Sequence, residues 1–229
     1  MNWAVKKSVT AVAVPPAKPG PAALIKGGSN LRTCNGLREF VDVLGDAAGA
    51  RVLDLGTAWQ STISFLVDRG CRVSAEDLLR GWKDFLGAEE EHERTTAAAE
   101  NGEKVSSAAL MEKFLQSALQ YPERSFHGIL AWDTLDYFDA ESVSVLMERL
   151  FHLLHPGGAL LALFHSRSAE GFHRYRIMDS QTVELLPAPT LVVHAHVFRN
   201  REILDLFGRF RSSKTFVGRD QIREALFLR

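Results

Sequence analysis

Residues 51–57, with the sequence RVLDLGT, constrain the fold of this chain more than any other segment. The apolar residues of this segment suit a buried strand and are too few for a helix. Asp54 and Gly56 stand at the carboxyl end of that strand, where an open α/β sheet places its ligand crevice. A glycine lets the backbone approach a ligand closely, and the helix that follows would offer unpaired N–H groups. The segment therefore predicts a strand that leads into a ligand-binding turn.

A second strand, residues 73–77, ends in two acidic residues about twenty positions beyond this glycine. We assign Asp77 to the hydroxyl groups of a ribose, because a carboxylate can accept two hydrogen bonds from a vicinal diol. Glu76 is the alternative, since a shift of one residue at a strand end exchanges the side chain that faces the crevice. Strand, glycine turn, helix, strand and acid together predict one nucleotide-binding βαβ unit.

Three further segments follow in the sequence. They are YPERSFHGIL at 121–130, AWD at 131–133 and LHPGGALL at 154–161. Residues 126–132 are nearly all apolar and predict a central strand, and residues 159–164 predict the fifth strand after a proline-glycine-glycine turn. The chain ends in two predicted strands, 214–217 and 222–228, which are joined at 218–220.

The order and spacing of these motifs resemble those of the class I S-adenosylmethionine-dependent methyltransferases. The resemblance covers residues 31–229. It implies an α/β fold with a doubly wound, mostly parallel seven-stranded sheet, helices on both faces and a C-terminal antiparallel hairpin. It also implies S-adenosylmethionine as cofactor and the transfer of its methyl group as activity.

The implied cofactor site lies at the carboxyl ends of three strands. Its expected residues are Asp54, Gly56, Thr57, Ala58, Glu76, Asp77, Trp132 and Asp133. Residues 56–58 would lie beside the methionine part of the cofactor, with Asp54 orienting the turn or the amino group. Trp132 and Asp133 would line the adenine or the methyl-donating side, and a plain core role for Trp132 is equally open.

The sequence departs from the family pattern in the first loop. Ala58 stands where the family usually has a second glycine, and bulky Trp59 and Gln60 follow it. Alanine disfavours a positive φ by about 1 kcal/mol or more, so the loop is expected to differ in shape. His127 also replaces the usual aspartate, and the acid after the third strand has no clear counterpart. These departures keep a second reading open, namely a catalytically inactive methyltransferase-like binding or scaffold protein.

Methyl transfer from a sulfonium needs alignment and desolvation more than a fixed catalytic group. An oxygen nucleophile would benefit from a general base, and His165 at the end of the fifth strand is the best-placed candidate, followed by Asp133. A hydrogen-bonded structural histidine is the alternative role for His165. The asparagine-proline-proline-aromatic loop of many nucleic-acid amino methyltransferases is absent, and DTLD stands at 133–136 instead. We therefore expect an unidentified small-molecule or protein acceptor.

The remaining segments predict further elements of secondary structure. Residues 1–30, rich in proline and alanine, are expected to be a flexible arm, and 31–44 a helix. The third strand is placed near 113–115. Residues 166–197 are expected to be an insertion above the pocket, with a hairpin over 175–178 and 181–186 and a further strand over 191–197.

The composition excludes some classes of protein. A net charge of −1 gives no strong nucleic-acid signal, and no apolar run reaches the length of a membrane span, so a cytoplasmic protein is expected. Cys34 and Cys71 are expected to be reduced core thiols. The histidine pairs 152/155 and 194/196 lack clustered cysteine or acidic partners, so ordinary histidines are favoured over a metal site.

Overall fold

The computed structural model describes residues 30–45, 49–96, 105–168, 171–193, 195–218 and 220–229. Nine strands and six α-helices are assigned in these ranges. The strands are β1 (Leu31–Thr33), β2 (Arg51–Asp54), β3 (Arg72–Ala75), β4 (Phe126–Trp132), β5 (Leu154–His165), β6 (His173–Ile177), β7 (Thr182–Pro187), β8 (Ser212–Val217) and β9 (Ile222–Leu228). The helices are α1 (Asn35–Leu44), α2 (Gln60–Val67), α3 (Leu78–Thr96), α4 (Ser107–Leu115), α5 (Ala140–Leu153) and α6 (Asn200–Leu206), with a 3₁₀ turn η1 (Thr134–Tyr137).

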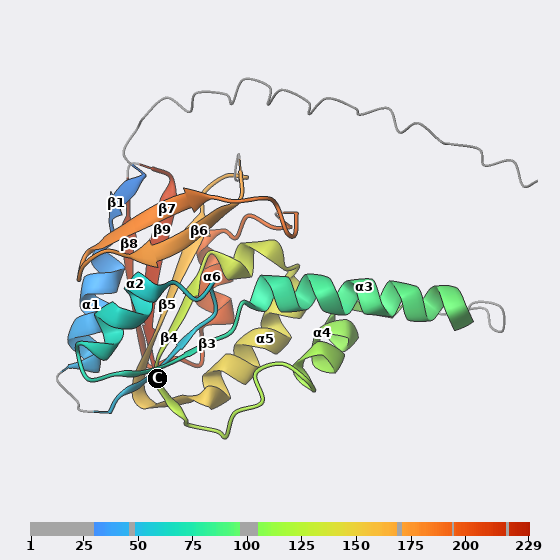
Figure 1. Cartoon of the computed structure of the whole chain (residues 1–229), viewed down its shortest axis with the longest axis horizontal. Coiled ribbons are helices and arrows are strands. Elements are labelled where there is room, and N and C mark those ends of the chain that lie inside the picture. Colours follow the sequence, from blue (N-terminus) through green and yellow to red (C-terminus); the bar gives the residue numbers. More distant parts are fainter. Residues whose placement is uncertain (1–29, 46–48, 97–104, 169–170, 194, 219) are drawn as a thin grey trace, which may run out of the picture.

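The main sheet has six strands in the order β3-β2-β4-β5-β9-β8 (Figure 1). Strands β3, β2, β4 and β5 run parallel, and β9 and β8 add an antiparallel hairpin at one edge. The α/β class, the mostly parallel sheet and the closing hairpin are confirmed. The predicted seventh strand is wrong for the described part of the chain, where a separate three-stranded sheet, β1-β7-β6, is found instead.

Side chains of the central strands alternate between two cores, as the twofold period of a strand requires. In β4, Ile129 and Ala131 belong to the core beneath α3, α4, α5 and α6, whereas Leu130 and Trp132 belong to the core beneath α1 and α2. Both faces of the sheet are therefore covered by helices, and β4 is buried along most of its length. This burial explains why its sequence reads as a continuous apolar run.

The region proposed for the third strand is helical, and that prediction is wrong. Residues 113–115 close α4, whose buried residues Met111, Phe114 and Leu115 recur at helical spacing. Ser106 caps this helix by accepting a hydrogen bond from the Ala109 N–H. Helical burial against α5 therefore determines the conformation of this short apolar stretch.

The segment before the first parallel strand also differs from its prediction. Residues 31–33 form β1, and only residues 35–44 form the expected helix. Strand β1 pairs with β7, and Arg32 forms ion pairs with Asp220 and Glu224 at 2.7 and 2.9 Å. Residues 31–33, which were expected to begin the helix, therefore belong to the three-stranded sheet. The rest of the proposed arm, residues 1–29, lies outside the described residues.

The hairpin proposed within 166–197 is confirmed as β6 and β7, which pair antiparallel. The strand proposed for 191–197 is wrong, because the described residues of that range have no strand assignment; residue 194 is outside them. In Figure 1 the three-stranded sheet lies across the end of the main sheet at which the parallel strands finish. Its position places β6 next to the residues predicted to bind cofactor.

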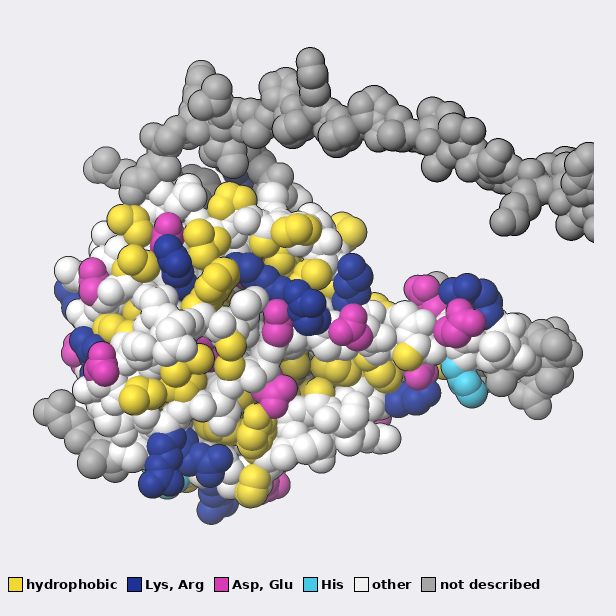
Figure 2. Space-filling view, viewed as in Figure 1, with side chains coloured by type: hydrophobic (Ala, Val, Ile, Leu, Met, Phe, Trp, Pro, Cys, Tyr) yellow, Lys and Arg dark blue, Asp and Glu magenta, His cyan; other side chains and the backbone are white. Residues whose placement is uncertain are grey.

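Helix α3 projects from the body of the molecule (Figure 1), and its outer half carries both acidic and basic side chains (Figure 2).

None of the helices in the described ranges is both long and apolar enough to cross a membrane. Cys34 and Cys71 are buried and free.

Candidate functional site

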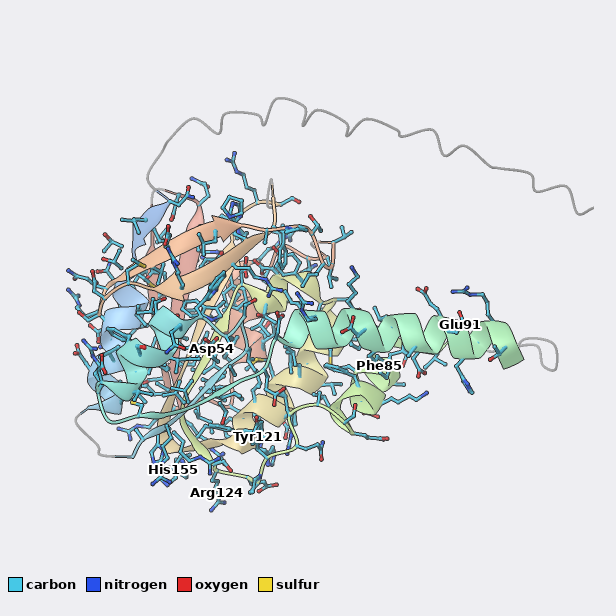
Figure 3. All side chains as sticks on the ribbon, viewed as in Figure 1. Asp54, Phe85, Glu91, Tyr121, Arg124 and His155 are labelled. Atoms are coloured by element: carbon cyan, nitrogen blue, oxygen red, sulfur yellow. The ribbon has the colours of Figure 1, made fainter. Side chains whose placement is uncertain are left out.

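The turn after β2 is organised by a buried carboxylate. Asp54 is 2% exposed, and its Oδ1 accepts hydrogen bonds from the Gly56 N–H at 2.9 Å and the Trp132 Nε1–H at 2.7 Å. Burial raises the pKa of Asp54 to about 6, although both hydrogen bonds act to lower it. Figure 3 shows Asp54 inside the body of the molecule, near the place where α3 leaves the sheet. Asp54 therefore holds the turn through its hydrogen bond with the Gly56 N–H.

Asp77 lies beside that turn and accepts four hydrogen bonds. Thr57 Oγ1 donates to Oδ2 at 3.1 Å, and the Arg80 N–H donates to Oδ1 at 3.2 Å. The Arg174 guanidinium adds two parallel bonds, Nη1 to Oδ1 and Nη2 to Oδ2, both at 3.0 Å. The glycine turn and the acid that follows β3 are thus joined by a hydrogen bond, and β6 supplies half of the donors to that acid.

Glu76 has a different environment from its neighbour. The Tyr121 hydroxyl donates to its Oε1 at 2.6 Å, while the Glu76 N–H donates to the Asp54 carbonyl at 2.8 Å. Of the two candidate acids, Asp77 is therefore the one that contacts the turn.

Trp132 covers the glycine turn. A β-carbon built on Gly56 would lie 2.8 Å from Cδ1 of the indole, so only glycine fits beneath the ring. The Trp132 backbone has a φ of 49°, a left-handed conformation that is unusual for a bulky residue. The ring also stacks on Tyr175 of β6, with centroids 5.5 Å apart and planes at 3°. Both the main chain and the neighbours of Trp132 hold its indole over the turn.

The loop that departs from the family pattern leads directly into α2. Ala58 and Gln60 are exposed, and Trp59 is half-buried. Among the described atoms the Trp59 Nε1–H is buried and has no hydrogen-bond partner. No side chain caps the N-terminus of α2, so its first N–H groups remain suited to an anionic or polar ligand group.

A second polar cluster lies at the ends of β4 and β5. His165, the last residue of β5, has its backbone N–H bonded to Asp136 Oδ2 at 2.7 Å and its Nδ1 at 3.0 Å from the same oxygen. Its Nε2 lies 3.9 Å from Asp133 Oδ2, which also accepts a hydrogen bond from the Tyr175 hydroxyl at 3.0 Å. The two residues proposed for acid–base chemistry, His165 and Asp133, are thus brought together.

The charges in this cluster oppose one another. Burial acts to lower the pKa of His165, but the hydrogen bond to Asp136 and the charges of Asp133 and Asp136 outweigh it, so the pKa is raised. Burial raises the pKa of Asp133 to about 6, against the charge of His165. His165 also lines a surface pocket of about 200 Å³ together with Arg167 and His173. The raised pKa of both groups favours the binding of a proton in this cluster, beside a solvent-accessible hollow.

Sequence reasoning missed four members of these clusters. Arg174, Tyr175, Asp136 and Tyr121 reach the site from β6, η1 and the segment before β4. The alternating pattern of the predicted hairpin indicated that one face of β6 is buried, but no local pattern identified the carboxylates that this strand would meet.

The histidine pair 152/155 does not form a shared site. Helix α5 ends at Leu153, so His152 pairs with Glu148 on the helix while His155 stacks on His127 from β5. His194 lies outside the described residues. No group of three or more potential metal ligands occurs in the ranges that the structure describes. His127 accepts the Arg51 N–H at 3.1 Å at the opposite end of β4 from the site.

No family model matches the sequence, and the comparison with curated proteins finds no match. Similar solved structures include a SAM-dependent methyltransferase from Methanosarcina mazei, at 14% identity and a TM-score of 0.44, over 84% of this chain and 96% of that chain. A SAM-dependent methyltransferase from Mesorhizobium loti has 16% identity and a TM-score of 0.45, over 84% and 95%.

The 1,6-didemethyltoxoflavin-N1-methyltransferase of Burkholderia thailandensis, solved with 1,6-didemethyltoxoflavin and S-adenosylhomocysteine, is similar at 14% identity. Its TM-score is 0.42, over 85% of this chain and 78% of that chain. Because these scores lie below 0.5, we base the functional proposal on the residues of this chain.

Proposed function

We propose that the chain is an S-adenosylmethionine-dependent methyltransferase acting on a small-molecule or protein acceptor. The observation that supports this most is the Thr57–Asp77 hydrogen bond, which joins a glycine turn and an acid at the ends of neighbouring parallel strands. In this proposal Asp77 binds the ribose hydroxyls of the cofactor. The neighbouring Glu76 accepts a hydrogen bond from the Tyr121 hydroxyl. The turn at 56–58 and the uncapped N-terminus of α2 would contact the methionine part of the cofactor. Asp54 would hold this turn through its hydrogen bond with the Gly56 N–H.

Trp132 and Asp133 form the wall on the side of the adenine or of the reactive methyl group. The cofactor would supply the electrophilic methyl group, and the protein would align it and exclude water. His165 would accept the proton of an oxygen or nitrogen nucleophile at Nε2, because Asp136 engages Nδ1. Asp133, with its raised pKa, is the second candidate for this proton.

One observation favours a second candidate function, a methyltransferase-like binding protein without activity. The four carboxylates expected near the cofactor all have internal donors: Trp132 on Asp54, Tyr121 on Glu76, Arg174 on Asp77 and Tyr175 on Asp133. A protein that had lost its cofactor would be stabilised by such contacts, because they satisfy buried acceptors.

Titration calorimetry with S-adenosylmethionine and S-adenosylhomocysteine separates the two functions. Methyltransferase function predicts micromolar binding that weakens at least about tenfold in Asp77→Asn, because the amide accepts fewer hydrogen bonds from a diol. Asp179→Asn, an exposed aspartate in the turn between β6 and β7, is the matched control and should bind as the wild type does. Absence of heat in the wild type and in Arg174→Ala alike would reject methyl transfer.

A further inference from the structure

Strand β6 fastens the three-stranded sheet to the site through neighbouring residues that point to opposite faces. Tyr175 contacts Asp133 and Trp132, and the Ile177 N–H donates to Thr62 Oγ1 of α2 at 2.9 Å. Arg174, which precedes Tyr175 and points to the other face, reaches Asp77. The contacts of Tyr175 and Ile177 are independent of Asp77, so they can persist when the Arg174 contact is broken.

The Arg174–Asp77 pair fills the carboxylate's capacity for hydrogen bonds. A carboxylate has about four lone-pair sites, and the donors on Asp77 are Thr57, Arg80 and both terminal nitrogens of Arg174. Thr57 lies in the turn after β2, and Arg80 lies in the first turn of α3. The Arg174 guanidinium occupies one site on each carboxylate oxygen, so a ribose diol that contacts both oxygens competes with it directly.

The pair is also held in place. The side chains of Arg174 and Asp77 are 11% and 19% exposed, so water screens their attraction less than at an open surface. The Arg174 guanidinium additionally lies over the Phe172 ring, 4.9 Å from its centroid. Such a bidentate contact has the geometry of an arginine that recognises a carboxylate specifically.

We propose that Arg174 competes with the cofactor's ribose for Asp77 and so sets the affinity of the site. This inference rests on the proposed function, because it takes Asp77 as the ribose acceptor. The apparent affinity of a site that is free only part of the time falls in proportion to the free fraction. Removing the competitor therefore raises affinity, whereas removing a residue that binds the ligand would lower it.

The test compares Arg174→Ala with Arg176→Ala by calorimetry with S-adenosylhomocysteine. Arg176 lies two residues along the same strand and pairs with Glu184 at 2.5 Å, away from Asp77. We expect Arg174→Ala to bind about tenfold more tightly than the wild type or better, and Arg176→Ala to bind unchanged. Equal or weaker binding by Arg174→Ala, with a wild type that binds, overturns the competition and leaves methyl transfer standing.

Adenosine and 2′-deoxyadenosine serve as probes that do not depend on methyl transfer. Competition for Asp77 predicts that Arg174→Ala gains affinity for adenosine and gains little for the deoxy compound, which lacks the diol. If Arg174→Ala gains affinity for adenosine but does not bind S-adenosylhomocysteine, the competition is retained and the proposed function is rejected. Equal gains in affinity for adenosine and 2′-deoxyadenosine would overturn the competition. If Arg174→Ala binds none of the three ligands, the competition and the proposed function are both overturned.

Discussion

The indole nitrogen of Trp132 donates a hydrogen bond to the buried Asp54 carboxylate across 2.7 Å, so the last residue of β4 closes over the turn after β2. The contact joins residues 78 positions apart in the chain. It makes the turn part of the protein's core and links its stability to the protonation of one acid.

Trp132→Phe is expected to destabilise the protein by about 1–3 kcal/mol, because a buried carboxylate loses a donor. Trp59→Phe is the matched control: its indole N–H is buried without a partner among the described atoms, so its removal should be neutral or slightly stabilising. Urea unfolding midpoints measure both changes. Equal losses in the two variants would contradict this assignment.

Asp54→Asn should change how stability depends on pH. The pKa of Asp54 is raised from 3.8 to about 6 in the folded state, so its contribution to stability is full below pH 3.8 and is lost as the pH rises through about 6. An asparagine Oδ1 can still accept from Trp132 and Gly56 but does not titrate. The variant should therefore gain on the order of 1–3 kcal/mol relative to the wild type between pH 4 and 7. Parallel stability curves over that range would refute the raised pKa.

Two Gly→Ala substitutions should have opposite effects. At Gly56 the new methyl group would lie 2.8 Å from the Trp132 ring, and we expect a loss of about 1–3 kcal/mol with a displaced indole. A β-carbon built on Gly87, within α3, would meet no heavy atom within 4 Å apart from its chain neighbours and its own helix backbone, and alanine should stabilise the helix by about 0.5–1 kcal/mol. Thermal unfolding and tryptophan fluorescence report the two outcomes, and a neutral Gly56→Ala would show that the indole does not rest on the turn.

Asp136→Asn should lower the pKa of His165, because Asp136 contributes both a hydrogen bond and a negative charge that raise it. A His165 base works when deprotonated, so the rising limb of a pH–rate profile should move to lower pH in this variant. Titration of the imidazole by NMR measures the same shift without substrate. Glu148→Gln, next to the surface histidine His152, is the control and should leave His165 unchanged. An unshifted His165 would contradict the role given to Asp136.

Much of the framework could be predicted from the sequence because it depends on local patterns. Strand β4 matches its predicted range, since a buried parallel strand must be apolar on both faces. The approach of Thr57 to Asp77 follows from the rule that parallel strands end at one edge. The error at 113–115 has an equally local cause, because a short apolar run does not distinguish a strand from the buried face of a helix.

The sequence alone determined a βαβ unit, its glycine turn and its paired acids, because strand period and turn chemistry act over a few residues. Only the tertiary structure decided which donors those acids receive. Arg174 lies 97 positions from Asp77, and the two meet because a three-stranded sheet docks on the main one. Such a contact depends on how two surfaces fit together, and no pattern within either segment specifies that fit.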